Sequence, residues 1–123
     1  MQQMYKRNQL IFILVILISI VIISLKFFIN NSQPFGVTIL RVSSNSMVPK
    51  LKKGDFIIIK KQSQYEVGDI ITYEVIEENN VYYVTHRIIE KNENGFVTKG
   101  DANNKIDDCK VCESEIKGKV IFP

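Results

Sequence analysis

An uninterrupted apolar run near the N-terminus constrains this 123-residue chain more than any other feature. Residues 10–25 contain no polar side chain except two serines, and Phe27-Phe28-Ile29 extend the run beyond Lys26. As a helix, residues 10–29 would be about 30 Å long, which is the hydrocarbon thickness of a bilayer. The lysine near its end can extend to the lipid headgroups. The run therefore predicts one transmembrane anchor over residues 10–29.

A cleaved secretory signal is the alternative interpretation of this run. The apolar region of such a signal is usually about 7–15 residues long and ends at an A-x-A-like cleavage site. The only alanine of the chain is Ala102, which lies far downstream. We therefore expect an uncleaved anchor.

Basic residues around the run indicate its direction in the membrane. Lys6 and Arg7 precede it, whereas Lys26 is the only basic residue close behind it before Arg41. The positive-inside rule then places residues 1–9 in the cytoplasm and sends the chain after about residue 30 across the membrane. We expect a single-pass protein of the cell membrane whose larger part is extracytoplasmic.

The formal net charge of +3 comes entirely from the N-terminal segment. Residues 1–29 hold three of the sixteen basic residues and no acidic one, so the thirteen bases that remain equal the thirteen acids. A nucleic-acid-binding surface needs surplus positive charge on the folded part of the chain. The balance therefore excludes nucleic acid as an expected partner.

The chain after the anchor is rich in strand-forming residues divided by turn signals. Residues 30–34 are polar and predict a short linker, and Glu78-Asn79-Asn80 and Asn94-Gly95 predict hairpins. The continuous run Phe56-Ile57-Ile58-Ile59 predicts a strand that is buried on both faces. We expect residues 35–123 to form a mainly β, small, curled, antiparallel domain with six strands: Phe35–Val42, Phe56–Lys60, Ile70–Ile76, Val81–Glu90, Gly95–Lys99 and Ile116–Phe122.

Cys109 and Cys112 form a C-x-x-C pair in the part that is expected to be exported, where oxidation is permitted. A structural zinc site needs two further ligands, and the chain has no second Cys or His pair. We expect no metal site and no cofactor, and a local disulfide is the first expectation for the pair. A redox role is less favoured because no βαβ pattern surrounds it.

The stretch Ser44-Asn45-Ser46-Met47-Val48-Pro49 is where chemistry is first expected. It follows the apolar run that ends at Val42, so Ser46 would lie on a turn that leaves a strand. A serine in a turn is usually only a turn former. Ser44 could add a hydroxyl donor to the backbone N–H of Ser46, and such a pair would stabilise an oxyanion.

His86, the only histidine, lies in the predicted strand Val81–Glu90, where a histidine is usually structural. Imidazole has an unperturbed pKa of about 6.5 and is the side chain best able to accept a serine proton at neutral pH.

A catalytic imidazole needs a third group to orient it, and three downstream carboxylates are available: Asp101, Asp107 and Asp108. The order Ser, His, Asp matches none of the familiar serine-hydrolase orders. A lysine base, from Lys60, Lys61 or Lys99, is the alternative.

Four motifs in order resemble those of type I signal peptidases. They are Ser44-x-Ser46-Met47-x-Pro49 after one span, Gly-Asp before apolar strands, Thr85-His86-Arg87-Ile88, and Lys99-Gly100-Asp101-x-Asn103-Asn104-x-x-Asp107. Most bacterial members have a lysine base where this chain has His86. The resemblance is therefore to the Ser-His branch, which is typical of the endoplasmic reticulum and archaea and is also found in some Gram-positive bacteria. Self-cleaving SOS repressors share a related Ser-Met motif, but the anchor and His86 argue against them.

The resemblance implies a membrane-anchored serine endopeptidase that removes signal peptides from exported preproteins and cuts after small residues. It implies Ser46 as the nucleophile and His86 as the general base. The two loop aspartates of the family map to Asp107, favoured as the partner of the imidazole, and to Asp101, in a supporting role. The expected partners are preproteins and membrane lipid, and also membrane subunits, since some Ser-His members work in complexes. The alternative is a membrane-tethered β module that binds or scaffolds exported proteins without cutting them.

Overall fold

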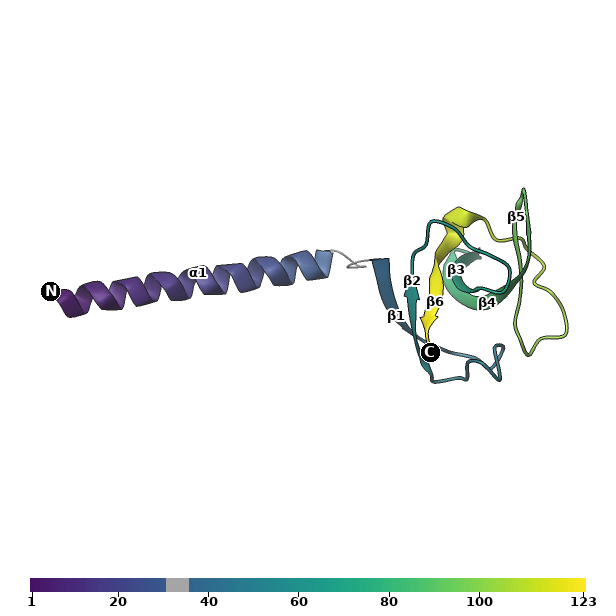
Figure 1. The fold of residues 1–123 in the computed structure, drawn as a ribbon, viewed down its shortest axis with the longest axis horizontal. Helices are drawn as coiled ribbons and strands as arrows, with labels where there is room; N and C mark the ends of the chain where they lie inside the picture. Colours follow the sequence, from purple (N-terminus) through teal and green to yellow (C-terminus); the bar gives the residue numbers. More distant parts are fainter. Residues whose placement is uncertain (31–35) are drawn as a thin grey trace. The chain divides into compact units, whose positions relative to one another are not determined.

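The N-terminal apolar run forms one helix, α1 (Gln2–Asn30), in a computed structural model that describes residues 1–30 and 36–123 of the chain (Figure 1). Apolar side chains are exposed all round this helix, as expected of a segment that has lipid on every side. Within the described residues, α1 is the only helix that is long and apolar enough to cross a membrane. The helix begins at Gln2, earlier than the predicted anchor, because the polar residues before Leu10 are also good helix formers.

The chain divides into two compact units, residues 1–34 and 35–123. Within residues 36–123, six strands form one antiparallel sheet in the order β1-β2-β6-β3-β4-β5. Their bounds are β1 (Val37–Arg41), β2 (Phe56–Lys60), β3 (Ile70–Glu77), β4 (Asn80–Asn92), β5 (Gly95–Lys99) and β6 (Ile116–Phe122), with a short 3-10 helix, η2 (Glu113–Glu115), before β6. The sheet is strongly curled (Figure 1). The predicted fold class, a small curled antiparallel β domain with one N-terminal apolar helix, is confirmed.

Five of the predicted strands match the observed ones within two residues at each end. For the first strand, the predicted start at Phe35 lies outside the described residues. The predicted linker from residue 31 onward also lies outside them.

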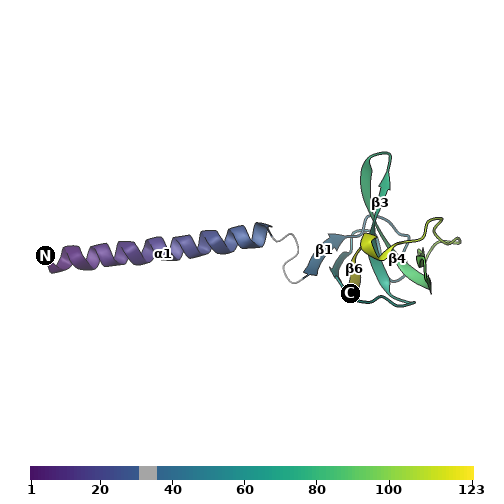
Figure 2. The same cartoon turned by 90° about the horizontal axis from the view of Figure 1, so that it is seen from above.

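The β3–β4 hairpin extends from the rest of the domain (Figure 2). Its turn is two residues long, because Glu77 pairs with Asn80. Both turn residues have positive φ, 48° at Glu78 and 67° at Asn79, which is the backbone that a tight hairpin requires. This turn fixes the register of β4 and therefore places His86 opposite Ile71.

The prediction for β2 is wrong in one respect: the strand is not buried on both faces. Phe56 is 64% exposed, whereas Ile57 is 1% exposed and Ile59 is equally buried. The strand alternates because the sheet is one curled layer, in which only the inner face packs on the core. A continuous apolar run therefore does not by itself distinguish one buried face from two.

The core consists of two clusters of buried side chains, and the candidate site lies on both. One cluster contains Met47 and Leu51 from the serine loop together with Ile57, Ile59 and Ile70. The other contains Tyr73 from β3 together with Tyr65, Ile71, Ile88, Phe96, Val111 and Ile116. Each cluster thus fixes one side of the site through side chains that are themselves buried.

Candidate active site

The serine loop is held from beneath by its own apolar residues. Met47 is 2% exposed and Leu51 is fully buried, and the Leu51 N–H donates to the Met47 carbonyl at 2.9 Å. The Val48 N–H donates to the Asn45 carbonyl at 3.2 Å and tightens the same turn. Ser46 directly precedes the buried Met47 and is only half-buried. The loop therefore presents the Ser46 hydroxyl on a fixed backbone.

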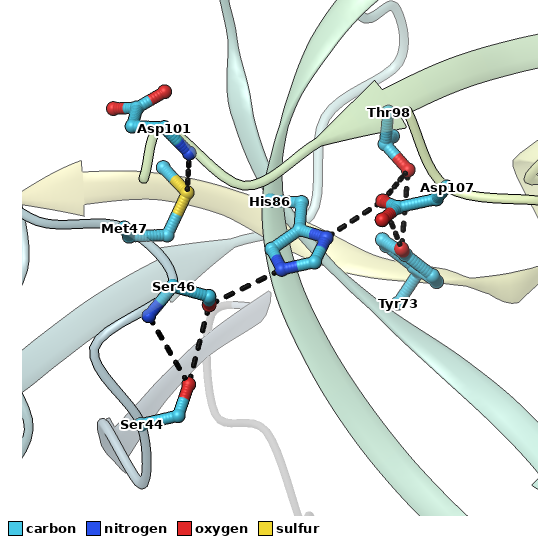
Figure 3. A network of polar contacts seen from close by, with 8 residues as sticks. All are labelled: Ser44, Ser46, Met47, Tyr73, His86, Thr98, Asp101 and Asp107. Atoms are coloured by element: carbon cyan, nitrogen blue, oxygen red, sulfur yellow. Dashed lines mark hydrogen bonds and ion pairs between the residues drawn. The ribbon is translucent and has the colours of Figure 1, made fainter. Parts of the chain in front are cut away.

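His86 reaches Ser46 from β4 (Figure 3). Its Nε2 lies 3.2 Å from the Ser46 Oγ, and its Nδ1 lies 2.6 Å from the Asp107 Oδ2. The imidazole is nearly buried, because the His86 side chain is only 11% exposed. In this arrangement an Nδ1–H bond to the carboxylate leaves Nε2 free to accept the serine proton.

Asp107 lies in the loop after β5 and is tied back to that strand. Its backbone N–H donates to the Thr98 carbonyl at 2.9 Å. Its Oδ2 accepts hydrogen bonds from the hydroxyl of Thr98 at 2.6 Å and from that of Tyr73 at 3.1 Å. The oxygen that faces His86 therefore has three hydrogen-bonding neighbours.

Asp101 binds an arginine and does not contact the imidazole. Arg87 donates from Nε to Oδ1 at 2.8 Å and from Nη2 to Oδ2 at 2.7 Å, and its Nη1 donates to the Gly68 carbonyl at 2.8 Å. The hydrogen bonds from Arg87 hold the pKa of Asp101 below its usual range. Asp108, the third carboxylate that the sequence offered, is exposed.

The backbone around Asp101 packs against the serine loop. The Asp101 N–H points to the Met47 Sδ at 3.4 Å, and the Ala102 N–H donates to the Ser46 carbonyl at 2.8 Å. A Cβ on Gly100 would lie 2.7 Å from that carbonyl oxygen, so only glycine fits there without a shift. Asp101 thus supports Ser46 through the loop that it anchors.

Ser44 lies beside the nucleophile candidate, as its spacing suggested. Its Oγ is 3.2 Å from the Ser46 Oγ and 3.4 Å from the Ser46 backbone nitrogen. The second contact is longer than an ordinary N–H···O bond and is therefore weak. A substrate oxygen entering between them would meet the Ser44 hydroxyl and the Ser46 N–H together.

A groove of about 640 Å³ runs past the two serines, between the end of β1 and the first half of β4. β1 is the last strand of the sheet, and β4 pairs with β5 only from Arg87 onward. Among the described residues, both walls thus leave one backbone edge without a neighbouring strand. Such edges can pair with an extended peptide.

Three residues of this site were not predicted from the sequence: Tyr73, Thr98 and Arg87. Tyr73 and Thr98 sit at buried positions of strands, where they look like ordinary core residues. Arg87 was noted only as part of a motif. Its position directly after His86, the candidate base, is the one signal that could have pointed to it. None of these roles follows from spacing along the chain.

The expected local disulfide is not formed: in the part of the chain that the structure describes, Cys109 and Cys112 are free and exposed. Val111 between them pairs with Phe96 in a β-bridge, and the backbone of Cys112 is extended. Over residues 1–30 and 36–123, no three His, Cys, Asp or Glu side chains are grouped so as to hold a metal ion.

Comparison with known proteins identifies the family of the chain. The family described as Peptidase S24-like matches residues 18–121, from within α1 to within β6. The chain therefore belongs to the Peptidase S24-like family.

The relationship is to type I signal peptidases. The chain is 32% identical over 117 residues to Signal peptidase I W of Bacillus subtilis, an alignment that covers 89% of this chain and 60% of that protein. The chain thus spans less than two thirds of the length of this curated relative.

Proposed function

We propose that this protein is a membrane-anchored serine endopeptidase that removes signal peptides from exported preproteins. The observation that carries the proposal is the linear contact from Ser46 through His86 to Asp107, with distances of 3.2 Å and 2.6 Å. The similarity to Signal peptidase I W supports the substrate class. Ser46 is the nucleophile, His86 the general base and Asp107 the group that orients the imidazole.

The reaction divides peptide hydrolysis into two steps. Ser46 Oγ attacks the scissile carbonyl while His86 Nε2 takes its proton, and His86 then protonates the leaving amine. Water, deprotonated by the same imidazole, attacks the acyl-enzyme. The ester bond to Ser46 then breaks, His86 returns the proton to the Ser46 Oγ, and the signal peptide leaves with a free carboxylate. The Ser44 hydroxyl and the Ser46 N–H stabilise the oxyanion in both steps.

A lysine base is less well supported than His86. Lys61, one of the lysines that the sequence offered, donates from Nζ to the Ile116 carbonyl at 2.5 Å. The hydrogen bonds of the Ser46 Oγ go instead to His86 and Ser44. Imidazole is therefore the base that this geometry favours.

The groove supports binding of the substrate as an added strand. Its backbone edges at β1 and β4 can hydrogen-bond the residues before the cut without reading their side chains. Leu40, Val42 and Val84 line the groove with apolar surface. This lining favours small apolar side chains, such as alanine, at the first and third positions before the cut.

Helix α1 anchors the enzyme with residues 1–9 in the cytoplasm and the domain of residues 35–123 outside the membrane. Two basic residues before the apolar run support this direction. A preprotein whose apolar segment lies in the same bilayer meets the enzyme in two dimensions, which raises the effective concentration of its cleavage site. The protein thus acts at the outer membrane face.

Co-expression with a reporter preprotein that carries an A-x-A site tests this function. The wild-type chain should process the reporter, and the Ser46→Ala variant should not, while Ser63→Ala, an exposed serine after β2, serves as the matched control. The competing function, a scaffold that binds exported proteins, predicts that Ser46→Ala behaves as wild type. Equal processing of the reporter by Ser46→Ala and wild type would therefore contradict the proposed peptidase function.

A further inference from the structure

The carboxylate oxygen that faces His86 is crowded with donors. Asp107 Oδ2 lies 2.6 Å from His86 Nδ1, 2.6 Å from Thr98 Oγ1 and 3.1 Å from the Tyr73 OH (Figure 3). The two hydroxyls also lie 3.1 Å from each other. The two hydroxyl protons of Thr98 and Tyr73 are thus available for three contacts, namely the one between the hydroxyls and the two with Asp107. The charged carboxylate oxygen is the stronger acceptor and therefore receives both protons.

Both hydroxyls are held rigidly and remain protonated. Thr98 is fully buried in β5, and Tyr73 is 5% exposed on β3 within a core cluster. Burial raises the pKa of the Tyr73 phenol well above its ordinary value, so Tyr73 is a donor at every working pH. The protonated phenol therefore meets the Asp107 carboxylate as a hydrogen-bond donor.

Asp107 itself is not fixed by packing. Its side chain is 22% exposed, and it borders a hollow of about 1080 Å³ that the loop of residues 102–110 helps to line. A carboxylate in such a loop can rotate its oxygens away from an imidazole. The directional bonds from two strands are what restrict it.

We propose that Tyr73 and Thr98 are positioning residues that lock Asp107 Oδ2 onto Nδ1 of His86. The role rests on the proposed peptidase function, because it matters only if His86 acts as the base. Thr98 and Tyr73 lie on the strands β5 and β3, and their hydroxyls hold the side chain of Asp107, which lies in a loop. His86 then keeps one tautomer and one ring orientation, with Nε2 directed at Ser46.

The single histidine makes a direct readout practical. In the full chain, carried without a histidine tag in detergent micelles and labelled with nitrogen-15 histidine, every imidazole signal comes from His86. The wild type should show an Nδ1–H proton resonance that is protected from exchange with water. Tyr73→Phe and Thr98→Val should each broaden this resonance, and the double variant should lose it.

Peptidase kinetics supply the second readout. Each single variant should lower kcat/KM on an A-x-A preprotein by about threefold to 100-fold, because misplacing a catalytic group by about 1 Å costs up to about 10²-fold. Thr98→Ser keeps the hydroxyl and should restore activity. In an Asp107→Ala background, Tyr73→Phe should add no further loss, since its effect passes through Asp107.

Two buried hydroxyls elsewhere provide matched controls. Tyr65 is 1% exposed and its OH accepts from the Gln62 N–H at 3.1 Å, and Thr72 is fully buried and contacts Thr85 at 2.8 Å between the Oγ1 atoms. Tyr65→Phe and Thr72→Val should leave both the Nδ1–H resonance and kcat/KM unchanged. If these controls reduced both readouts as much as Tyr73→Phe and Thr98→Val did, the role would be structural and the proposal overturned.

The two readouts separate this proposal from the proposed function. A protected Nδ1–H signal that survives in the Tyr73→Phe, Thr98→Val double variant would overturn the positioning role, even in an active peptidase. A wild type that shows the hydroxyl-dependent signal but cuts no preprotein would instead overturn the peptidase and leave the placement of His86 by these hydroxyls intact. If the double variant does not fold, the Thr98→Val and Tyr73→Phe single variants, compared with Thr98→Ser, decide the outcome by the same two readouts.

Discussion

The carboxylate of Asp107 lies 2.6 Å from Nδ1 of His86, although 21 positions separate the two residues in the chain. The nearer candidate, Asp101, is turned to Arg87 instead. Two aspartates of one loop thus have different environments: one contacts the imidazole and the other holds the loop. The first predictions follow from this difference.

Replacing Asp107 should disable catalysis without unfolding the protein. We expect Asp107→Asn to lower kcat by about 10⁴-fold, as for the corresponding change in other serine-histidine-aspartate sites, because the amide can favour the wrong imidazole tautomer. Asp108→Asn, an exposed neighbour, is the matched control. Steady-state kinetics on a preprotein measure the effect, and equal activities of the two variants would contradict the assignment of Asp107.

Replacing Asp101 should weaken the fold in a pH-dependent way. Its pKa is lower in the folded protein than in the unfolded chain, so the carboxylate stabilises the fold above the unfolded value, about 4, and this contribution disappears as pH falls through the lowered pKa. We expect Asp101→Asn to cost about 1 kcal/mol at pH 7 and less at pH 2, where part of the contribution of the carboxylate is lost. Thermal unfolding at the two pH values measures this.

Glu66→Gln is the control for that experiment. Glu66 pairs with Lys91 at 3.2 Å through side chains that are largely exposed, so its removal should change stability little at either pH. A pH-independent loss in Asp101→Asn would show that shape, and not charge, is what the carboxylate contributes.

The strands and turns of this domain could be predicted because their signals are local. Asn79 and Gly95 have the positive φ values that their turns require, and the β-branched runs between such turns became strands. The exposed face of β2 could not be predicted, because Phe56 lies in an apolar run and only the curl of the sheet decides which side packs. The free cysteines likewise reflect a tertiary contact, the pairing of Val111 with Phe96.

The site was predictable only in part, for a related reason. His86 stands out because it is the only histidine of the chain, and Ser46 stands out because it is expected on a turn that follows an apolar run. The choice between Asp101 and Asp107 as the partner of the imidazole depends on which carboxylate the loop turns toward His86, and the spacing of residues along the chain does not determine this. Tyr73 and Thr98 were missed because their hydroxyls face inward from strand positions that resemble core.

Ser44 should contribute to the chemical step and little to substrate binding. If its hydroxyl joins the Ser46 N–H in holding the oxyanion, Ser44→Ala should lower kcat by about 10²–10³-fold with KM nearly unchanged. Ser63→Ala, outside the groove, should change neither. A change confined to KM would place Ser44 in substrate binding and remove it from the oxyanion site.

Gly100 should be intolerant of a side chain for a reason specific to the site. An added Cβ would lie 2.7 Å from the Ser46 carbonyl oxygen and 2.6 Å from Asn103 Nδ2, so Gly100→Ala must push the loop off Ser46. We expect activity to fall about 10²-fold, since small displacements of catalytic groups are costly.

Gly118→Ala is a matched steric control for Gly100→Ala. Its Cβ would lie 2.9 Å from the Lys60 backbone, between β6 and β2 and away from Ser46. We expect it to lower the unfolding temperature while leaving kcat of the folded protein unchanged. If both alanine variants lost kcat equally, the close approach at Gly100 would have no special role in the site.

The central claim is that Ser46 and His86 cut a preprotein together, and cleavage by the purified full chain tests it most directly. The measurement is mass spectrometry of the new N-terminus formed from an A-x-A preprotein by wild type, Ser46→Ala and His86→Ala, with each variant first shown to be folded by its thermal transition. Wild type should make a single cut directly after the A-x-A site, and neither variant should cut. Cleavage of the same bond at wild-type rate by folded Ser46→Ala or His86→Ala would contradict the joint role of Ser46 and His86.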